Sequence, residues 1–201
     1  LSAKITVTTP VVVRAKAGET PHIAYTVGPF AFSAAGSALV GLAMEKASAC
    51  GSDILKFSNG AVMLDCALDD HSINAAYSSG SGVSMTGGWM RRSVVRNFAQ
   101  HQSCGATLQE TLVDSCVLTN LAGEGKSPIV CNKKTTLRNT IIARNHPHAT
   151  YKGSNNGGGL AVSANLADDA RGVRIENCTI ADNTNWLSGN SKLGGGLYAA
   201  E

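Results

Sequence analysis

The chain has 201 residues, of which 43% are hydrophobic and 15% are charged, enough for one ordinary domain with a substantial core. Its formal net charge of +3 is small and its basic residues are interspersed with acidic ones, which disfavours nucleic acid as a partner. No apolar run in the sequence approaches the roughly 18 residues that a membrane-spanning helix needs.

The chain opens with β-rich runs. Segments 5–7 and 11–13 are predicted strands, and segment 18–21 is a predicted turn. Segment 38–46 is ambiguous, because some of its apolar residues have helical spacing, whereas Gly41 suits two short strands joined by a bend. We favour the two strands. Further strands are predicted to begin near Ile54, Val83, Ile129 and Leu160.

Five stretches of the sequence can be superimposed on one another. Each has a short alternating strand, one polar or charged residue and a second short alternating strand. They begin at Ala61, Gly88, Glu110, Thr135 and Val173, which defines a unit of 22 to 38 residues. A repeat too short to enclose its own core must stack on copies of itself, so the pattern predicts a solenoid. With one further strand per unit, the expected fold is all-β, a right-handed single-stranded parallel β-helix of about seven coils.

We expect residues 1–201 to form a single domain. The first residues have the pattern of the middle of a strand and segment 194–201 opens a new unit, so we expect the chain to be part of a longer polypeptide. The interval between Thr140 and Cys178 is longer than the others, which predicts a loop insertion in the region 146–172. In such solenoids, loops of this kind are where function is expected.

One position lies between the two strands of each superimposed stretch. A strand that turns sharply without glycine needs a residue that tolerates left-handed backbone, and Asn and Asp tolerate it best. We therefore interpret the two aspartates at this position as members of a stacked polar ladder and not as catalytic carboxylates. Arginine is not favoured there, so a local distortion is expected at its position. The five residues are Asp65, Arg92, Asp114, Asn139 and Asn177.

Alternation along the second strand of each stretch separates core residues from surface residues. The residues predicted to face inward are small and then branched, namely Cys66 and Leu68, Ser93 and Val95, Ser115 and Val117, Thr140 and Ile142, Cys178 and Ile180. The outside of the central units is predicted to carry an apolar stripe of Val94, Val113, Cys116, Leu118 and Ile141. A contiguous apolar stripe is usually covered, either by the protein's own loops or by a partner.

Two short motifs recur in the second half of the chain. Gly-Gly-x-hydrophobic occurs at 158–161 and 195–198, and Ile-x-x-Asn ends at Asn145 and Asn183. Together they resemble the right-handed, pectate-lyase-like β-helix repeats of bacterial secreted and surface proteins, particularly the polymorphic outer-membrane protein and autotransporter passenger repeats. Those repeats have Phe-x-x-Asn where most copies here have Ile. The resemblance covers residues 54–201 and implies a secreted or cell-surface location, but the scaffold hosts lyases, hydrolases and adhesins alike.

The expected function is that of a non-catalytic, rigid structural, adhesive or assembly element. It would bind a protein partner or a glycan, or self-associate through the apolar stripe or the solenoid ends, and no cofactor or metal is expected. The alternative is a polysaccharide lyase or glycoside hydrolase, which would need clustered carboxylates and, for a lyase, Ca²⁺. The best catalytic cluster is Asp69, Asp70, His71, Arg91 and Arg96. Asp69 and Arg96 occupy equivalent positions and could touch, which a surface ion pair explains equally well.

The remaining histidines and cysteines carry weaker signals. The sequence around His146 and His148 is rich in Ser, Asn and Gly, so a solvated loop is favoured over a metal site. Cys66 and Cys178 lie several units apart and are expected to be small core residues. The disulfide candidates are Cys104 and Cys131, about one unit apart, while Cys50 and Cys116 are unassigned.

Overall fold

The computed structural model describes residues 3–26, 30–46, 54–69, 81–98, 105–123, 127–147, 157–162, 172–185 and 195–199. Within these ranges the chain consists of short strands joined by tight turns, and none of it is α-helical. The described part of the chain has no helix with the length and apolar character needed to cross a bilayer.

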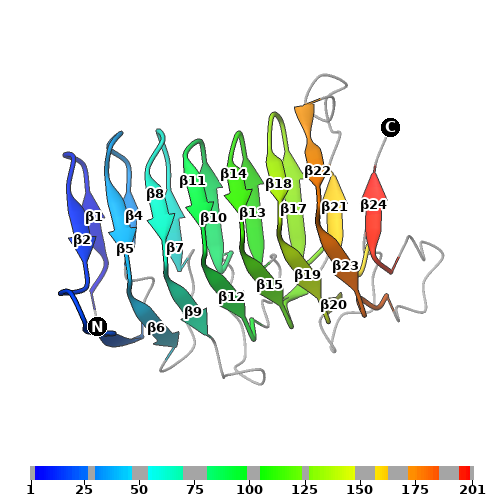
Figure 1. The fold of residues 1–201 in the computed structure, drawn as a ribbon, viewed down its shortest axis with the longest axis horizontal. Helices are drawn as coiled ribbons and strands as arrows, with labels where there is room; N and C mark the ends of the chain where they lie inside the picture. Colours follow the sequence, from blue (N-terminus) through cyan, green and yellow to red (C-terminus); the bar gives the residue numbers. More distant parts are fainter. Residues whose placement is uncertain are drawn as a thin grey trace.

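The strands stack into three long parallel sheets, to which successive turns of the chain contribute one strand each (Figure 1). The first sheet contains β1 (Ile5–Val7), β4 (Phe30–Phe32), β7 (Leu55–Phe57), β10 (Val83–Thr86), β13 (Ala106–Gln109), β17 (Ile129–Asn132), β21 (Leu160–Val162) and β24 (Leu197–Ala199). The second contains β2 (Val12–Arg14), β5 (Ala38–Val40), β8 (Val62–Leu64), β11 (Trp89–Arg91), β14 (Leu112–Asp114), β18 (Thr136–Arg138) and β22 (Arg174–Glu176).

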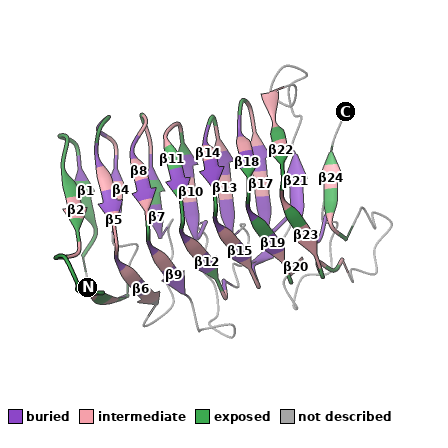
Figure 2. Cartoon of the chain, in the orientation of Figure 1, coloured by how far each residue is buried: buried purple, intermediate pink, exposed green. Residues whose placement is uncertain are grey.

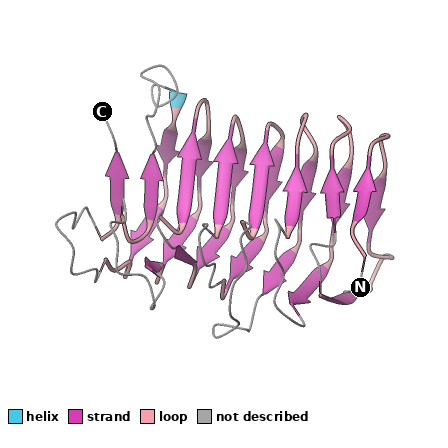
Figure 3. Ribbon diagram, turned by 180° about the vertical axis from the view of Figure 1, so that it is seen from behind, coloured by secondary structure: helices cyan, strands magenta, loops and turns pink. Residues whose placement is uncertain are grey.

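The third sheet contains β3 (His22–Tyr25), β6 (Ala43–Lys46), β9 (Ala67–Asp69), β12 (Val94–Arg96), β15 (Val117–Thr119), β19 (Ile141–Ala143) and β23 (Thr179–Ala181). A small fourth sheet pairs β16 (Ala122–Gly123) with β20 (His146–Pro147). Figure 3 shows the strands of the first sheet side by side and pointing the same way.

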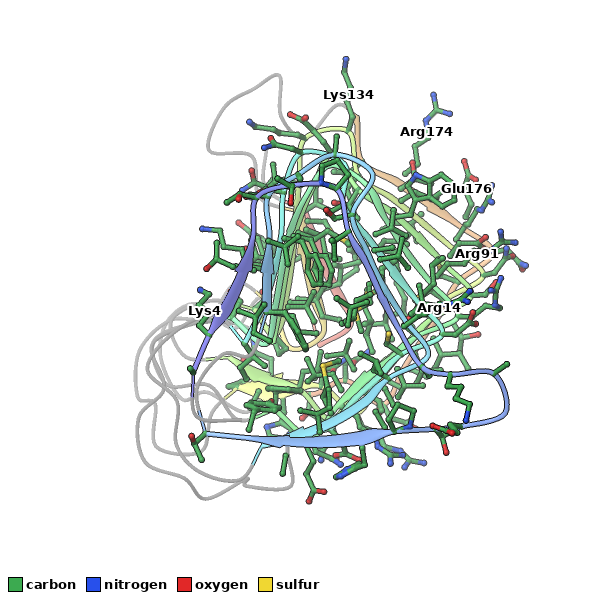
Figure 4. All side chains as sticks on the ribbon, turned by 90° about the vertical axis from the view of Figure 1, so that its left-hand side faces the viewer. Lys4, Arg14, Arg91, Lys134, Arg174 and Glu176 are labelled. Carbon is green, nitrogen blue, oxygen red and sulfur yellow. The ribbon has the colours of Figure 1, made fainter. Side chains whose placement is uncertain are left out.

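Figure 4 looks along the solenoid from its N-terminal end. The chain runs up the first sheet, turns over the top, descends the second sheet and returns along the third. This path is clockwise as the chain recedes from the viewer, so the solenoid is right-handed. The right-handed parallel β-helix predicted from the repeat is confirmed.

Inward-facing side chains of the three sheets share one apolar core. Phe32 and Phe57 stack with their ring centroids 5.3 Å apart, and both are fully buried. Complete burial of such a side chain stabilises the fold by about 1.5–3 kcal/mol relative to its exposure. Figure 2 shows alternate buried residues along β10, β13 and β17, whereas β2 and β24 are mostly exposed and contain no fully buried residue. The core is therefore best developed in the middle of the solenoid.

A left-handed bend joins the second sheet to the third. Gly41, Asp65, Arg92, Ser115, Asn139 and Asn177 occupy it, with φ between 45° and 69°. Four of the five predicted bend residues are confirmed. Arg92 has the same left-handed backbone as its neighbours, so the distortion expected at its position is not observed. Amides connect part of the ladder, because Asn177 Nδ2 donates to Asn139 Oδ1 at 2.8 Å.

The fifth predicted bend residue, Asp114, is wrong by one position. Ser115 has φ 56° and forms the bend, while Asp114 ends β14 in register with Arg91 and Arg138. When the bend is placed one residue too early, every side chain of the following strand is assigned to the wrong face of the sheet. Accordingly, Ser115 is exposed and Val117 is half-buried, although both were predicted to face inward.

This shift also corrects the predicted apolar stripe. Val113, Cys116 and Leu118 are buried in the core, so they are not surface residues. Val94 and Ile141 do face outward, and register places both beside Val117. The stripe on the third sheet is therefore narrower than predicted.

The other predicted elements have mixed outcomes. Segment 38–46 forms β5 and β6 around Gly41, which confirms the two strands. The predicted strands near Ile54, Val83, Ile129 and Leu160 are present, but β13 was not predicted. Of the region 146–172, the structure describes 146–147, 157–162 and 172, so the loop insertion stays a prediction.

Candidate functional site

The outer face of the second sheet carries two parallel rows of side chains. The middle residue of each central strand is buried, so the residues on either side of it face outward. Register aligns one row of Val12, Ala38, Val62, Trp89, Leu112, Thr136 and Arg174. The other row is Arg14, Val40, Leu64, Arg91, Asp114, Arg138 and Glu176. A mostly apolar row thus lies beside a row that becomes charged from Arg91 onward.

A hollow of about 240 Å³ lies where the two rows meet at β11, β14 and β18. It is lined by Trp89, Met90, Arg91, Leu112, Asp114 and Arg138. Trp89 is 49% exposed, which is unusual for so large an apolar side chain. The hollow thus has an aromatic wall, an aliphatic wall and a charged wall.

The charged wall is an ion-pair row across three neighbouring strands. Arg91 Nε lies 3.3 Å from Asp114 Oδ2, and Arg138 donates from a terminal guanidinium nitrogen to the same oxygen at 3.1 Å. Asn139 Nδ2 and the Ser115 hydroxyl donate to Asp114 Oδ1 at 3.0 and 3.1 Å. The Asp114 side chain is 4% exposed, whereas the two arginine side chains are 46% and 44% exposed. A nearly buried carboxylate therefore holds two half-exposed guanidinium groups.

These contacts fix the charge of Asp114. Hydrogen bonds from Arg138 and Asn139 lower its pKa from 3.8 to about 2, against the opposing effect of desolvation. The carboxylate is therefore ionised at any physiological pH. It can orient positively charged neighbours, but it cannot serve as a general acid.

The predicted catalytic cluster is divided between two sheets. Arg96 Nε donates to Asp69 Oδ2 at 2.5 Å, which confirms that Asp69 and Arg96 touch. Asp69 Oδ1 also accepts from Asn97 Nδ2 at 2.6 Å, so this carboxylate is held in a local network on the third sheet. Arg91 belongs to the second sheet and pairs with Asp114 instead. Asp70 and His71 lie outside the described residues.

Among the described residues, the histidines and cysteines considered for metal binding or a disulfide do not form a second candidate site. The described ranges contain no group of three or more His, Cys, Asp or Glu placed to hold a metal ion. His146 lies in β20, with Nδ1 2.8 Å from the Pro147 carbonyl oxygen, and His148 is not described. Cys131 is fully buried in β17 and Cys104 is not described, so their disulfide stays a prediction.

Small polar residues line the core just after the bend. Cys66, Ser93, Cys116, Thr140 and Cys178 occupy equivalent positions on successive coils. Each thiol hydrogen-bonds to a backbone carbonyl, as Cys116 Sγ does with the Asp114 carbonyl at 3.3 Å. Three such positions lie between Cys66 and Cys178, which agrees with the prediction that these two cysteines lie several units apart as small core residues.

Sequence reasoning did not identify the hollow. The outward positions of Trp89 and Arg91 follow from alternation around buried Met90, so this signal was available locally. Asp114 was assigned to the bend, which separated it from Arg91 and Arg138. The second arginine is brought to the site by strand register alone.

Comparison of this chain with protein-family models, with curated proteins and with solved structures gave no match. The resemblance to bacterial β-helix repeats therefore rests on the two recurring motifs.

Proposed function

We propose that this β-solenoid is a non-catalytic, rigid element of a secreted or cell-surface protein and binds a glycan along the outer face of its second sheet. The observation that carries the proposal is the half-exposed Trp89 beside a hollow lined by Arg91, Asp114 and Arg138. A sugar ring has an apolar face and a rim of hydroxyl groups. An indole ring can pack against the apolar face of the sugar, while fixed polar groups on the protein hydrogen-bond to its hydroxyl groups and orient it.

The shape of the surface suits an extended ligand. The two rows run along the solenoid axis, at right angles to the strands, and neighbouring positions recur about every 4.8 Å. Parallel strands on both sides hold β11, β14 and β18 in place through backbone hydrogen bonds. A linear polymer lying across them would meet a backbone that is already fixed, so little backbone conformational entropy would be lost on binding.

The chemistry of the hollow favours binding over catalysis. A glycoside hydrolase uses two carboxyl groups on either side of the scissile bond. Among the described residues that line the hollow, Asp114 is the one carboxylate, and two arginines hold it ionised. A Ca²⁺-dependent lyase would need several carboxylates that are not already paired with cations. The enzymatic alternative gains no support from this surface.

The secreted or surface location and the adhesive or structural role belong to the same proposal. They are supported by the resemblance of the Gly-Gly-x-hydrophobic and Ile-x-x-Asn motifs to bacterial β-helix repeats. A protein partner on the stripe of Val94, Val117 and Ile141 is a competing possibility. We favour the second sheet because its exposed Trp89 borders a hollow, whereas the stripe consists of three aliphatic side chains.

Intrinsic fluorescence gives a direct test. The chain has two tryptophans, so Trp186→Phe leaves Trp89 as the sole indole reporter. This variant should bind members of an immobilised glycan panel, and a bound glycan should shift its Trp89 emission. Trp89→Ala should lose binding while keeping the circular dichroism spectrum of a folded β-protein. The proposal is overturned if no glycan binds, or if binding survives Trp89→Ala unchanged.

A further inference from the structure

The charges of the second sheet are not balanced. Its outward positions and its bend carry five of the chain's eight arginines but three carboxylates, and the strands of this sheet contain no lysine. The five arginines are Arg14, Arg91, Arg92, Arg138 and Arg174, and the carboxylates are Asp65, Asp114 and Glu176. Figure 4 shows Arg14, Arg91, Arg174 and Glu176 projecting from the same side of the solenoid. The excess is two positive charges, out of +3 for the whole chain.

Within the hollow, two guanidinium groups share one carboxylate oxygen. Arg91 and Arg138 both approach Asp114 Oδ2, and Asp114 Oδ1 already accepts from Asn139 and Ser115. Each guanidinium has five N–H donors, so one contact with Asp114 leaves most of them for another acceptor. Asp114 is therefore a positioning residue that holds two guanidinium groups, and Glu176, in register with Arg138 on the next strand, adds a second negative charge to this row.

We infer that the hollow beside Trp89 is a subsite for an acidic sugar unit, whose carboxylate is bound by Arg91 and Arg138 and whose ring packs on Trp89. The inference rests on the proposed function and specifies its ligand. Arginine binds carboxylates through two parallel hydrogen bonds, which lysine cannot provide. A neutral sugar has no carboxylate to accept this pair of hydrogen bonds. The combination of a flat apolar platform with paired guanidinium groups fits a ring that carries a carboxylate.

The experiment compares a polyuronate with its fully methyl-esterified form, which has the same ring without the charge. Affinities for wild-type protein are measured by isothermal titration calorimetry at low and at physiological ionic strength. We expect the acid to bind at least about tenfold more tightly than the ester, because hydrogen bonds to charged groups add most of the discrimination. Salt should reduce this preference.

Variants of single residues show which side chains cause the preference for the acid over the ester. Arg138→Gln and Arg91→Gln should each reduce the preference for the acid, while Arg138→Lys should restore part of it by keeping the charge without the bidentate geometry. Trp89→Ala should weaken binding of both polymers. Arg96→Gln removes an arginine from the third sheet, where it pairs with Asp69, and should leave both affinities unchanged. Urea unfolding checks that each variant is folded.

The outcomes separate the inference from the function on which it rests. Equal binding of acid and ester, with both lost in Trp89→Ala, would overturn the acidic-sugar inference and leave glycan binding intact. Failure of every glycan to bind would overturn the proposed function itself. A sulfated polysaccharide that binds as tightly as the polyuronate would overturn the specificity for carboxylate. Polyglutamate that binds equally well would replace the glycan by an acidic protein segment.

Discussion

Arg92 donates from Nε and from a terminal guanidinium nitrogen to the two carboxylate oxygens of Asp65, at 2.6 and 2.8 Å. The two residues occupy the same left-handed bend on successive coils, with φ of 45° and 52°. Long side chains rarely adopt this backbone region, whereas Asn adopts it more readily. At this coil, a bidentate ion pair takes the place of the amide contact that joins Asn139 and Asn177.

Substitutions at Arg92 distinguish the contribution of its backbone conformation to stability from that of its ion pair with Asp65. Arg92→Asn is expected to leave the urea midpoint of unfolding unchanged or to raise it, because Asn suits the bend and exposed ion pairs add little stability. Arg92→Val should lower the midpoint clearly, because a β-branched residue is strained at positive φ. Circular dichroism follows both transitions. If the Asn variant were the less stable of the two, the ion pair and not the backbone would control this bend.

Asn145 is a buried polar residue whose side chain satisfies the backbone of the preceding coil. Its Oδ1 accepts from the Leu121 amide at 2.9 Å and its Nδ2 donates to the Leu118 carbonyl at 3.2 Å. Asn145→Ala would leave the buried Leu121 amide without its partner, at about 1–3 kcal/mol, and would remove a second hydrogen bond from the Leu118 carbonyl, which stays paired within the sheet. We expect the free energy of unfolding to fall by about 3 kcal/mol, as measured by urea denaturation.

The matched control is Asn177→Gly, which removes an exposed amide contact and keeps a residue that tolerates positive φ. It should change the free energy of unfolding by no more than about 0.5 kcal/mol. Equal losses for the two variants would mean that the Asn145 hydrogen bonds add nothing beyond an exposed ladder contact.

The sequence was sufficient to predict the solenoid, because the repeat and the alternation within it are local signals. Phe32 and Phe57 lie one coil apart at matching positions of β4 and β7, and stacking of such copies is what the repeat predicts. The bend residues with Asn or Asp and a clear flanking alternation were also placed correctly, as Asn139 and Asn177 show.

The one-residue error at Ser115 had a physical cause. Asp114 and Ser115 are both short polar residues suited to a turn, so local preference alone chose the aspartate. The register of β14 between β11 and β18 decides the matter, and that register depends on packing between coils. The candidate site was missed for the same reason, because its carboxylate becomes part of the outer face only in the correct register.

The lowered pKa of Asp114 predicts that the free energy of unfolding decreases in acid. Its pKa is about 2 in the folded protein and 3.8 ordinarily, so between these pH values the unfolded chain binds more protons than the folded one. The stabilisation is therefore complete above about pH 4 and is lost as the pH falls toward 2. Urea unfolding over this range should show a steady decline for the wild type and a shallower one for Asp114→Asn.

Asp65 should add a second part to this decline, because a hydrogen bond from Arg92 lowers its pKa as well. Asp65→Asn, which keeps a good bend residue, should also flatten the profile, and the double variant should flatten it further. Identical profiles for the wild type and both single variants would show that neither ion pair contributes to stability.

Thiol labelling tests the corrected register of β15 directly. Cys116 is buried and burial raises its pKa to about 11; burial raises the pKa of Cys66 as well. The thiolate is the reactive form, and at pH 8 it would make up on the order of one in a thousand of the Cys116 side chains. Half-buried Cys178 should therefore be alkylated well before Cys66 and Cys116 in the native protein, with sites mapped by mass spectrometry. Labelling in urea is the control and should modify all three. If native Cys116 reacted as fast as Cys178, its side chain would face outward, and Asp114 would return to the bend and leave the ion-pair row of the hollow.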